Sequence, residues 1–208
     1  MIRLFLQKFQ FHSQVVGMIK ILLLDNYDSF TYNLYHYIDS TGGFIVDVIR
    51  NDAVNLTCIK SYDGIVLSPG PGLPQESGLL MDVIDAYYKS KRLFGVCLGH
   101  QALAKYFGAE LLNLPKVLHG IQTPIKINEP KHYIFSDLPS SIDVGRYHSW
   151  VVNPIGLPDC LEVTAIDYEN QIMALSHKKY DICSVQFHPE SIMTPYGMKI
   201  ILNWLDGF

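Results

Sequence analysis

The sequence predicts an α/β fold, in which an open, mostly parallel β-sheet is wrapped by helices on both faces and carries a small antiparallel β layer. Two observations predict this class. Apolar, strand-like runs alternate with helix-like segments up to residue 108, and short strand-like runs separated by turn residues follow residue 109. A third observation concerns domain number: no repeat, low-complexity tract or Gly/Ser linker divides the chain, so we expect one domain over residues 18–208.

The first half of this domain shows two alternating hydrophobic patterns. Short, continuous apolar runs are typical of strands buried on both faces, and segments with apolar residues three or four apart are typical of helices. We expect Asp28 or Ser29 to cap the first helix, and Gly42-Gly43 to end it. The expected strands are 20–24, 44–49, 64–67 and 93–96, and the expected helices are 28–40, 79–91 and 98–107.

The second half predicts antiparallel pairing, because its strand-like runs are bounded by turn residues rather than by helices. A final amphipathic helix is expected at the C-terminal end of the sequence. The expected strands are 121–127, 142–152, 161–167, 172–177 and 181–188, and the expected helix is 196–205.

Composition excludes several functional classes. Hydrophobic residues make up 49% of the chain, which is ample for a core, and 16 Lys and Arg stand against 20 Asp and Glu, for a net charge of −4. With no basic run, this balance argues against a nucleic-acid-binding protein. No apolar stretch approaches the roughly 20 residues of a membrane span, so we expect a cytoplasmic protein with no membrane partner. The charged fraction of 17% is low, which is consistent with a surface partly covered by a protein partner.

Residues 1–17 differ from the rest. Their apolar run is interrupted too often for a secretory signal, and no small-residue cleavage site follows. Met18 then begins an apolar run that reads like the natural start of a domain. We interpret residues 1–17 as an N-terminal extension, or as the product of a misassigned start codon.

Four cysteines are present, without any CxxC pair, so zinc-ligand spacing is absent and we expect free thiols. We expect Cys58, Cys160 and Cys183 to be packing residues. The chain also shows no acidic cluster suited to a metal, and we expect neither a metal nor a cofactor.

Cys97 has different surroundings. It lies between Gly95 and Gly99 in a G-x-C-x-G pattern, after an apolar strand and before a helical pattern. This context is typical of a nucleophile elbow, a sharp strand-to-helix turn that presents a side chain at the carboxyl edge of the sheet. The following helix N-terminus favours a thiolate, and the N–H of Leu98 is available as an oxyanion donor. We therefore predict that Cys97 is a nucleophile.

A thiol nucleophile needs a base, and His188 is the preferred candidate among eight histidines. It ends an apolar strand and is followed by Pro189, which holds the backbone extended. Residues two apart then point the same way, so Glu190 can reach the ring and complete a triad. His100 is the competing base, although no carboxylate accompanies it, and otherwise has a structural hydrogen-bonding role. We expect His148 to lie in a pocket wall.

The segment Ser68-Pro69-Gly70-Pro71-Gly72 follows the third expected strand. Alternating Pro and Gly make a loop that is stiff yet permits close backbone approach. At the carboxyl end of a strand, such a loop can present N–H groups to a substrate oxygen.

Taken together, SPGPG, GVCLGHQ and QFHPES resemble the class I, triad-type glutamine amidotransferases, over nearly all of the chain from Met18 onward. LLLDNYDSFTYNL, IRND, LHGIQTPI, GRYHSWVV and QFHPESIMTPYGMKIILNW are similar to one branch of that family. This branch is the small, glutamine-hydrolysing subunit of anthranilate synthase and of aminodeoxychorismate (para-aminobenzoate) synthase.

The resemblance implies a flavodoxin-like sheet and specific roles. Cys97 would attack the carboxamide of L-glutamine, His188 would transfer the proton, and Glu190 would orient His188. Ammonia would pass to a larger, chorismate-using subunit, which carries the magnesium site in such systems. Trp150 departs from the Leu expected at its position, although a backbone contact would survive that change. The resemblance assigns the oxyanion to the N–H groups of Gly70 and Leu98, and substrate contacts to Gly70, Pro71, Gly72, Gln101, Ser149 and Trp150.

Three other functions fit the same motifs. The chain could serve another synthase, of the GMP or carbamoyl-phosphate type, although DNYDSFTYNL and TPYGMKIILNW argue against this. It could be a regulatory subunit without glutaminase activity, which the intact Cys97, His188 and Glu190 disfavour. It could also act alone as a γ-glutamyl peptidase or thiol hydrolase.

Overall fold

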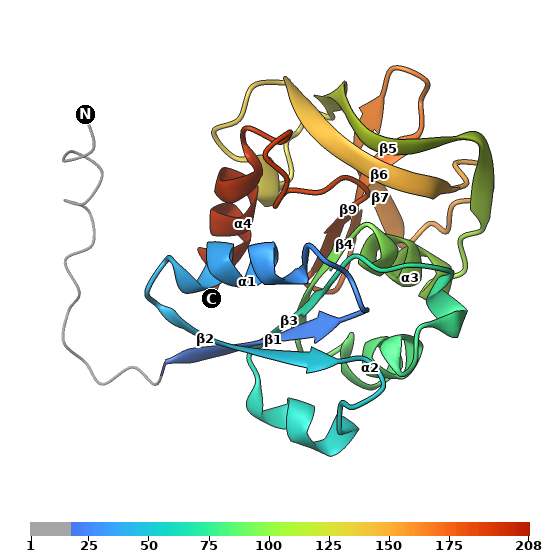
Figure 1. The fold of residues 1–208 in the computed structure, drawn as a ribbon. Helices are drawn as coiled ribbons and strands as arrows, with labels where there is room; N and C mark the ends of the chain where they lie inside the picture. The colour runs from blue at the N-terminus through green and yellow to red at the C-terminus, as the bar shows by residue number, and fades with distance from the viewer. Residues whose placement is uncertain (1–17) are drawn as a thin grey trace, which may run out of the picture.

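A computed structural model describes residues 18–208, and the prediction for residues 1–17 lies outside the described residues. Within them, nine strands form one sheet in the order β2-β1-β3-β4-β9-β8-β7-β5-β6 (Figure 1). The strands are β1 (Ile19–Asp25), β2 (Phe44–Arg50), β3 (Gly64–Leu67), β4 (Arg92–Val96), β5 (Leu111–Ile127), β6 (Ser141–Val152), β7 (Leu161–Asp167), β8 (Ile172–His177) and β9 (Ile182–Val185). The helices are α1 (Thr31–Asp39), α2 (Leu80–Tyr87), α3 (Leu98–Tyr106) and α4 (Gly197–Leu205), with short 3₁₀ turns η1 (Leu56–Ser61), η2 (Pro74–Glu76) and η3 (Tyr133–Phe135).

The parallel part of the sheet confirms the predicted α/β class. Strands β2, β1, β3, β4 and β9 pair in parallel, which is the 2-1-3-4-5 strand order of flavodoxin-like folds. Side chains of β1 alternate between two cores. Ile21 and Leu23 face the core that contains α1 and α4, whereas Leu22 and Leu24 face the core that contains α2 and α3. Helices therefore cover both faces of this part of the sheet.

The predicted antiparallel strands are present, and they are continuous with the parallel sheet. They extend the parallel sheet at one edge, from β8 through β7 and β5 to β6, and Figure 1 shows β5 and β6 at the end remote from β2. The two parts join at β9, which pairs in parallel with β4 and antiparallel with β8. The predicted antiparallel pairing of residues 181–188 is therefore confirmed on the β8 side of β9 and wrong on the β4 side.

Several boundaries also differ from the prediction. β5 begins at Leu111, ten residues before the expected 121. The prediction missed these residues because register shifts between residues 113 and 121 interrupt the alternation of the strand. α1 has Phe30 at its N-cap, so neither Asp28 nor Ser29 is the capping residue, although Asp28 Oδ1 accepts from Phe30 N at 2.8 Å. Asp25, at the end of β1, also supports this turn: its Oδ1 accepts from Thr31 Oγ1 at 2.8 Å and from Tyr27 N at 3.0 Å. α2 ends at Tyr87, four residues before the expected Lys91.

The four cysteines are free thiols, as predicted, but they do not share one environment. Cys183 is fully buried and Cys160 is partly buried, whereas Cys58 is exposed on η1, so its expected packing role was wrong. No helix among the described residues is both long and apolar enough to cross a bilayer.

Candidate active site

Cys97 lies at the carboxyl edge of the sheet, between the end of β4 and the start of α3. Its backbone adopts φ 51° and ψ −98°, a conformation that is unfavourable for a residue with a side chain. The strain is held by pairing on both sides: Cys97 N donates to Val185 O of β9 at 2.9 Å, and Cys97 O accepts from Gln101 N at 3.0 Å. The predicted sharp turn at this position is therefore confirmed.

Gly95 and Gly99 flank Cys97 because no side chain fits at either position. A Cβ on Gly95 would lie 2.7 Å from the backbone of Gly99. A Cβ on Gly99 would lie 2.7 Å from Leu67 Cβ and still closer to the Leu67 carbonyl oxygen. The G-x-C-x-G spacing thus lets α3 begin directly against β3 and β4, with Cys97 at the bend.

His188 follows β9, the strand beside β4, so the topology brings it to the edge occupied by Cys97. Its backbone N–H bonds Gly145 O of β6 at 3.0 Å. Its ring Nδ1 lies 2.6 Å from Glu190 Oε1, and both side chains are buried. Because a carboxylate accepts, this contact places a proton on Nδ1 and leaves Nε2 as the remaining ring nitrogen.

The pKa of His188 is raised well above its usual value. Burial opposes the charged ring, but the negative charge of Glu190, together with that of Cys97 when its sulfur is ionised, outweighs that cost. Nε2 is buried and makes no hydrogen bond within the described residues. A hydrogen bond between a catalytic base and its nucleophile is commonly long in the free enzyme and tightens when substrate binds. The ring is held in place by Phe30 and Tyr147, at centroid distances of 5.5 Å and 4.9 Å.

The loop after β3 is anchored by a buried amide network. Asn26 N donates to Ser68 Oγ at 2.8 Å, Asn26 Nδ2 donates to Ser68 O at 2.9 Å, and Asn51 Nδ2 donates to Asn26 Oδ1 at 3.0 Å. These bonds connect the loops after β1, β2 and β3. Gly70 packs so closely that an added Cβ would lie 2.6 Å from Asn26 and from Leu98 Cδ2. The loop is therefore held against the start of α3.

A cavity of about 160 Å³ opens beside Cys97. Two predicted site residues, His188 and Glu190, do not line it. Glu190 lies on an adjacent hollow, and Tyr147 lines both. Leu98 also lies outside the wall and is buried, although its N–H belongs to the first turn of α3. The lining residues are Gly70, Pro71, Gly72, Cys97, Gln101, Tyr147, His148, Ser149 and Trp150.

Comparison with known proteins identifies the family. The chain matches Glutamine amidotransferase class-I over residues 22–207. It belongs to the class-I glutamine amidotransferase family. Aminodeoxychorismate synthase component 2 of Escherichia coli is 45% identical over 187 residues, covering 89% of this chain and 98% of the relative. Anthranilate synthase component 2 of Azospirillum brasilense is also 45% identical, over 192 residues, covering 89% and 95%. A solved glutamine amidotransferase from Thermotoga maritima has a TM-score of 0.71 at 16% identity and covers 92% of this chain and 83% of its own, which supports the shared fold.

In this amidotransferase, two residues of the cavity wall, Gln101 and Trp150, are joined by a hydrogen bond. Gln101 Nε2 donates to the backbone oxygen of Trp150 at 2.9 Å, and also to Gln186 Oε1 at 3.3 Å. The contact to Trp150 uses only its backbone, which explains how Trp can replace the expected Leu. Gln186 was missed by the sequence analysis, which quoted it within QFHPES and gave it no role; it lies between the end of β9 and His188.

The other two histidines near the site have structural partners. His100 Nδ1 contacts Ser184 Oγ of β9 at 2.9 Å, in line with its predicted hydrogen-bonding role, and burial lowers its pKa to about 3. His148 lines the cavity, as predicted. Its Nε2 accepts from Arg146 Nε at 3.2 Å, and burial followed by the charge of Arg146 lowers its pKa to about 3. Both rings are therefore neutral near pH 7.

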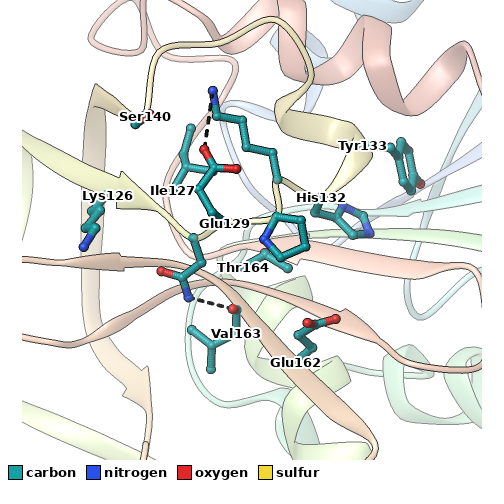
Figure 2. Close-up of a pocket in the computed structure, with 12 residues that line it drawn as sticks. Lys126, Ile127, Glu129, His132, Tyr133, Ser140, Glu162, Val163 and Thr164 are labelled. Carbon is teal, nitrogen blue, oxygen red and sulfur yellow. Dashed lines mark hydrogen bonds and ion pairs between the residues drawn. The ribbon is translucent and has the colours of Figure 1, made fainter.

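A larger cavity, of about 820 Å³, lies elsewhere on the amidotransferase (Figure 2). It is bounded by the end of β5, the segment that follows it, and β7, and it contains none of the predicted site residues. Its charged side chains, Lys126, Lys131, Glu129 and Glu162, are of both signs, and Lys131 lies 3.9 Å from Glu129. Among residues 18–208, no His, Cys, Asp and Glu side chains gather into a metal-binding cluster.

Proposed function

We propose that this chain is the glutamine-hydrolysing component of anthranilate synthase or aminodeoxychorismate synthase. It would convert L-glutamine to glutamate and ammonia through Cys97, His188 and Glu190. The observation that carries the proposal is a cysteine on a strained bend in a cavity wall, beside a strand whose histidine is oriented by a buried carboxylate at 2.6 Å. This is the arrangement that nucleophilic acyl transfer needs.

The first half-reaction forms a thioester. The Cys97 thiol proton passes to His188 Nε2, and the sulfur attacks the side-chain carboxamide carbon of glutamine. The N–H groups of Gly70 and Leu98 are proposed to bind the oxygen as it becomes negative. When the intermediate collapses, the C–N bond breaks and His188 returns its proton to the departing ammonia.

The second half-reaction restores the enzyme. Water gives a proton to His188 and attacks the γ-glutamyl thioester, so that the C–S bond breaks, glutamate forms and the sulfur recovers its proton. Throughout, Glu190 stabilises the imidazolium and keeps the Nδ1 proton in place. Its contact with His188 is buried, so solvent screens it little.

Substrate recognition is proposed for the cavity wall. Its lining includes Gly70, Pro71 and Gly72 of the loop after β3, and Ser149 and Trp150 of β6. Gln101 Nε2 is occupied by Trp150, which leaves Gln101 Oε1 to accept from the ammonium group of glutamine.

The acceptor of ammonia is proposed to be a larger, chorismate-using synthase subunit in the cytoplasm. Two relatives with equal identity are named component 2 of two different synthases, so the proposal covers both products. Ile192, two residues after Glu190, is almost fully exposed beside the site and is available for contact with such a subunit.

The test uses the chain co-purified with its synthase partner. We expect Cys97→Ala to abolish glutamine-dependent product formation, by at least about 10³-fold, because the nucleophile is lost. Product formation from ammonium should persist. Assaying anthranilate and aminodeoxychorismate separately identifies the pathway.

Cys58→Ala is the matched control, because this thiol is exposed and outside the cavity. It should leave both reactions unchanged. Normal glutaminase turnover in Cys97→Ala would show that the nucleophile is assigned to the wrong residue.

A further inference from the structure

Gln186 is a fully buried polar residue between β9 and His188 for which the proposed reaction has so far assigned no role. Its backbone N–H bonds Met173 O of β8 at 2.9 Å, which fixes the main chain. Its side chain contacts Gln101 on one side, and Cys97 Sγ, at 3.7 Å from Nε2, on the other. It therefore touches the atom proposed to react.

The orientation of this amide follows from a backbone carbonyl. Trp150 O can only accept, so the atom of Gln101 that faces it at 2.9 Å is the donor Nε2. The same nitrogen lies 3.3 Å from the Gln186 amide and requires an acceptor there, which is Oε1. Gln186 Nε2 is consequently the atom that faces Cys97 Sγ. The chain of bonds ends on the sulfur with an N–H donor.

We propose that Gln186 is a further catalytic residue, whose N–H stabilises the thiolate of Cys97. This rests on the proposed function, because it assigns a role within the same site. A hydrogen bond to the charged form of a group favours that form, and a charge-assisted bond is stronger than a neutral one. As the Cys97 proton passes to His188 Nε2, the negative charge that remains on sulfur gains the Gln186 donor.

The arrangement also connects recognition to reactivity. Gln101, proposed to contact glutamine, holds the Gln186 amide in the orientation that serves the sulfur. The alternative is that Gln186 only fills space in the core. The two roles differ in what happens when the shape is kept and the donor is removed.

Gln186→Met makes this distinction, because it removes the donor at similar size without adding charge. Gln186→Glu is the stronger perturbation. The carboxylate keeps an acceptor toward Gln101 and replaces only the NH₂ that faces the sulfur with an oxygen. A thiol holds its proton more tightly than a carboxylic acid does, so the negative charge falls on Glu and opposes ionisation of Cys97.

The measurement is the pH dependence of iodoacetamide alkylation of Cys97, followed by mass spectrometry of the Cys97 peptide so that Cys58 and Cys160 do not contribute. We expect the alkylation midpoint of Gln186→Glu to move upward by about one pH unit or more, and that of Gln186→Met by less. Gln75→Glu, which adds the same charge at an exposed position on η2, should not move it.

Thermal unfolding of each variant shows whether it is folded. A folded Gln186→Met with the wild-type midpoint would overturn the proposal; if that variant does not fold, an unchanged midpoint in Gln186→Glu would do so. Alkylation requires no glutamine and no partner. Its outcome is therefore separate from the turnover assay of Cys97→Ala, in which the proposed function itself would fail.

Discussion

The parallel and antiparallel parts of the sheet hold the site by different interactions. In the parallel part, the site depends on contact: Gly95, Gly99 and Gly70 lie where a methyl group would collide with backbone or side-chain atoms. In the antiparallel part, it depends on buried charge. Arg146 of β6 lies 2.7 Å from Asp167 of β7, and both side chains are about 95% buried.

The difference shows in what each part contributes. The parallel strands present Cys97 and His188 at their ends, where a shift of the backbone displaces a reacting atom. The antiparallel strands contribute Tyr147 to Trp150 of the cavity wall, where Trp150 acts through its backbone oxygen. Arg146 also bonds His148 Nε2 and Gln171 Oε1, so one guanidinium organises this wall. Side-chain identity at residue 150 is correspondingly less constrained.

Breaking the buried ion pair gives the largest expected effect. Asp167→Asn keeps the shape and removes the charge opposite Arg146, which leaves a buried cation unpaired. We expect the free energy of unfolding to fall by about 3 kcal/mol. Urea denaturation measures it.

Asp143→Asn on β6 is the control, because Asp143 is exposed, and it should change the free energy of unfolding by less than about 0.5 kcal/mol. Equal effects from the two substitutions would contradict the contrast between the parts of the sheet.

Disturbing the close packing should have the next largest effect. Gly99→Ala forces α3 away from Leu67, and overpacking of this kind costs about 2 kcal/mol. Because Cys97 adjoins α3, glutaminase turnover should fall as well. Denaturant unfolding and turnover are both measured.

Gly43→Ala provides the comparison, since its Cβ would meet nothing within 4 Å and its φ is ordinary. It should be neutral or slightly stabilising. A Gly99→Ala variant as stable and as active as Gly43→Ala would show that the close approach is unimportant.

The smallest expected effect, expressed per pH unit, is the contribution of one buried histidine to the pH dependence of stability. Burial lowers the pKa of His100 to about 3, whereas an unfolded histidine titrates near 6.5. The unfolded chain thus binds the proton first, and stability falls as the pH drops from 6.5 toward 3, by about 1.4 kcal/mol per pH unit for this group. His148 adds a similar loss.

His100→Gln should reduce that slope by one proton in urea unfolding measured at pH 7, 6 and 5. His36→Gln, at an exposed position on α1, should leave the slope unchanged. A wild-type slope in His100→Gln would mean that the His100 ring protonates readily in the folded state.

Local patterns were sufficient to predict most of the fold. Continuous apolar runs and helical spacing identified the parallel strands and their helices, because a strand that is buried on both faces must be apolar along most of its length. They failed where pairing partners decide the outcome. The run at 181–188 resembles its antiparallel neighbours, yet β9 pairs in parallel with β4. The start of β5 was missed because register shifts interrupt its alternation.

The same division applies to the site. The flanking glycines and the two-residue spacing of His188 and Glu190 were sufficient to predict a sharp bend and an oriented ring, because both follow from bonds and sterics within a few residues. The place of Gln186 against Cys97 was not predictable in this way. It depends on β9 lying beside β4, and on Trp150 of a distant strand turning the Gln101 amide. The direction of hydrogen bonds in a buried site depends on which chain segments pack together there, and the local sequence around each residue does not specify that packing.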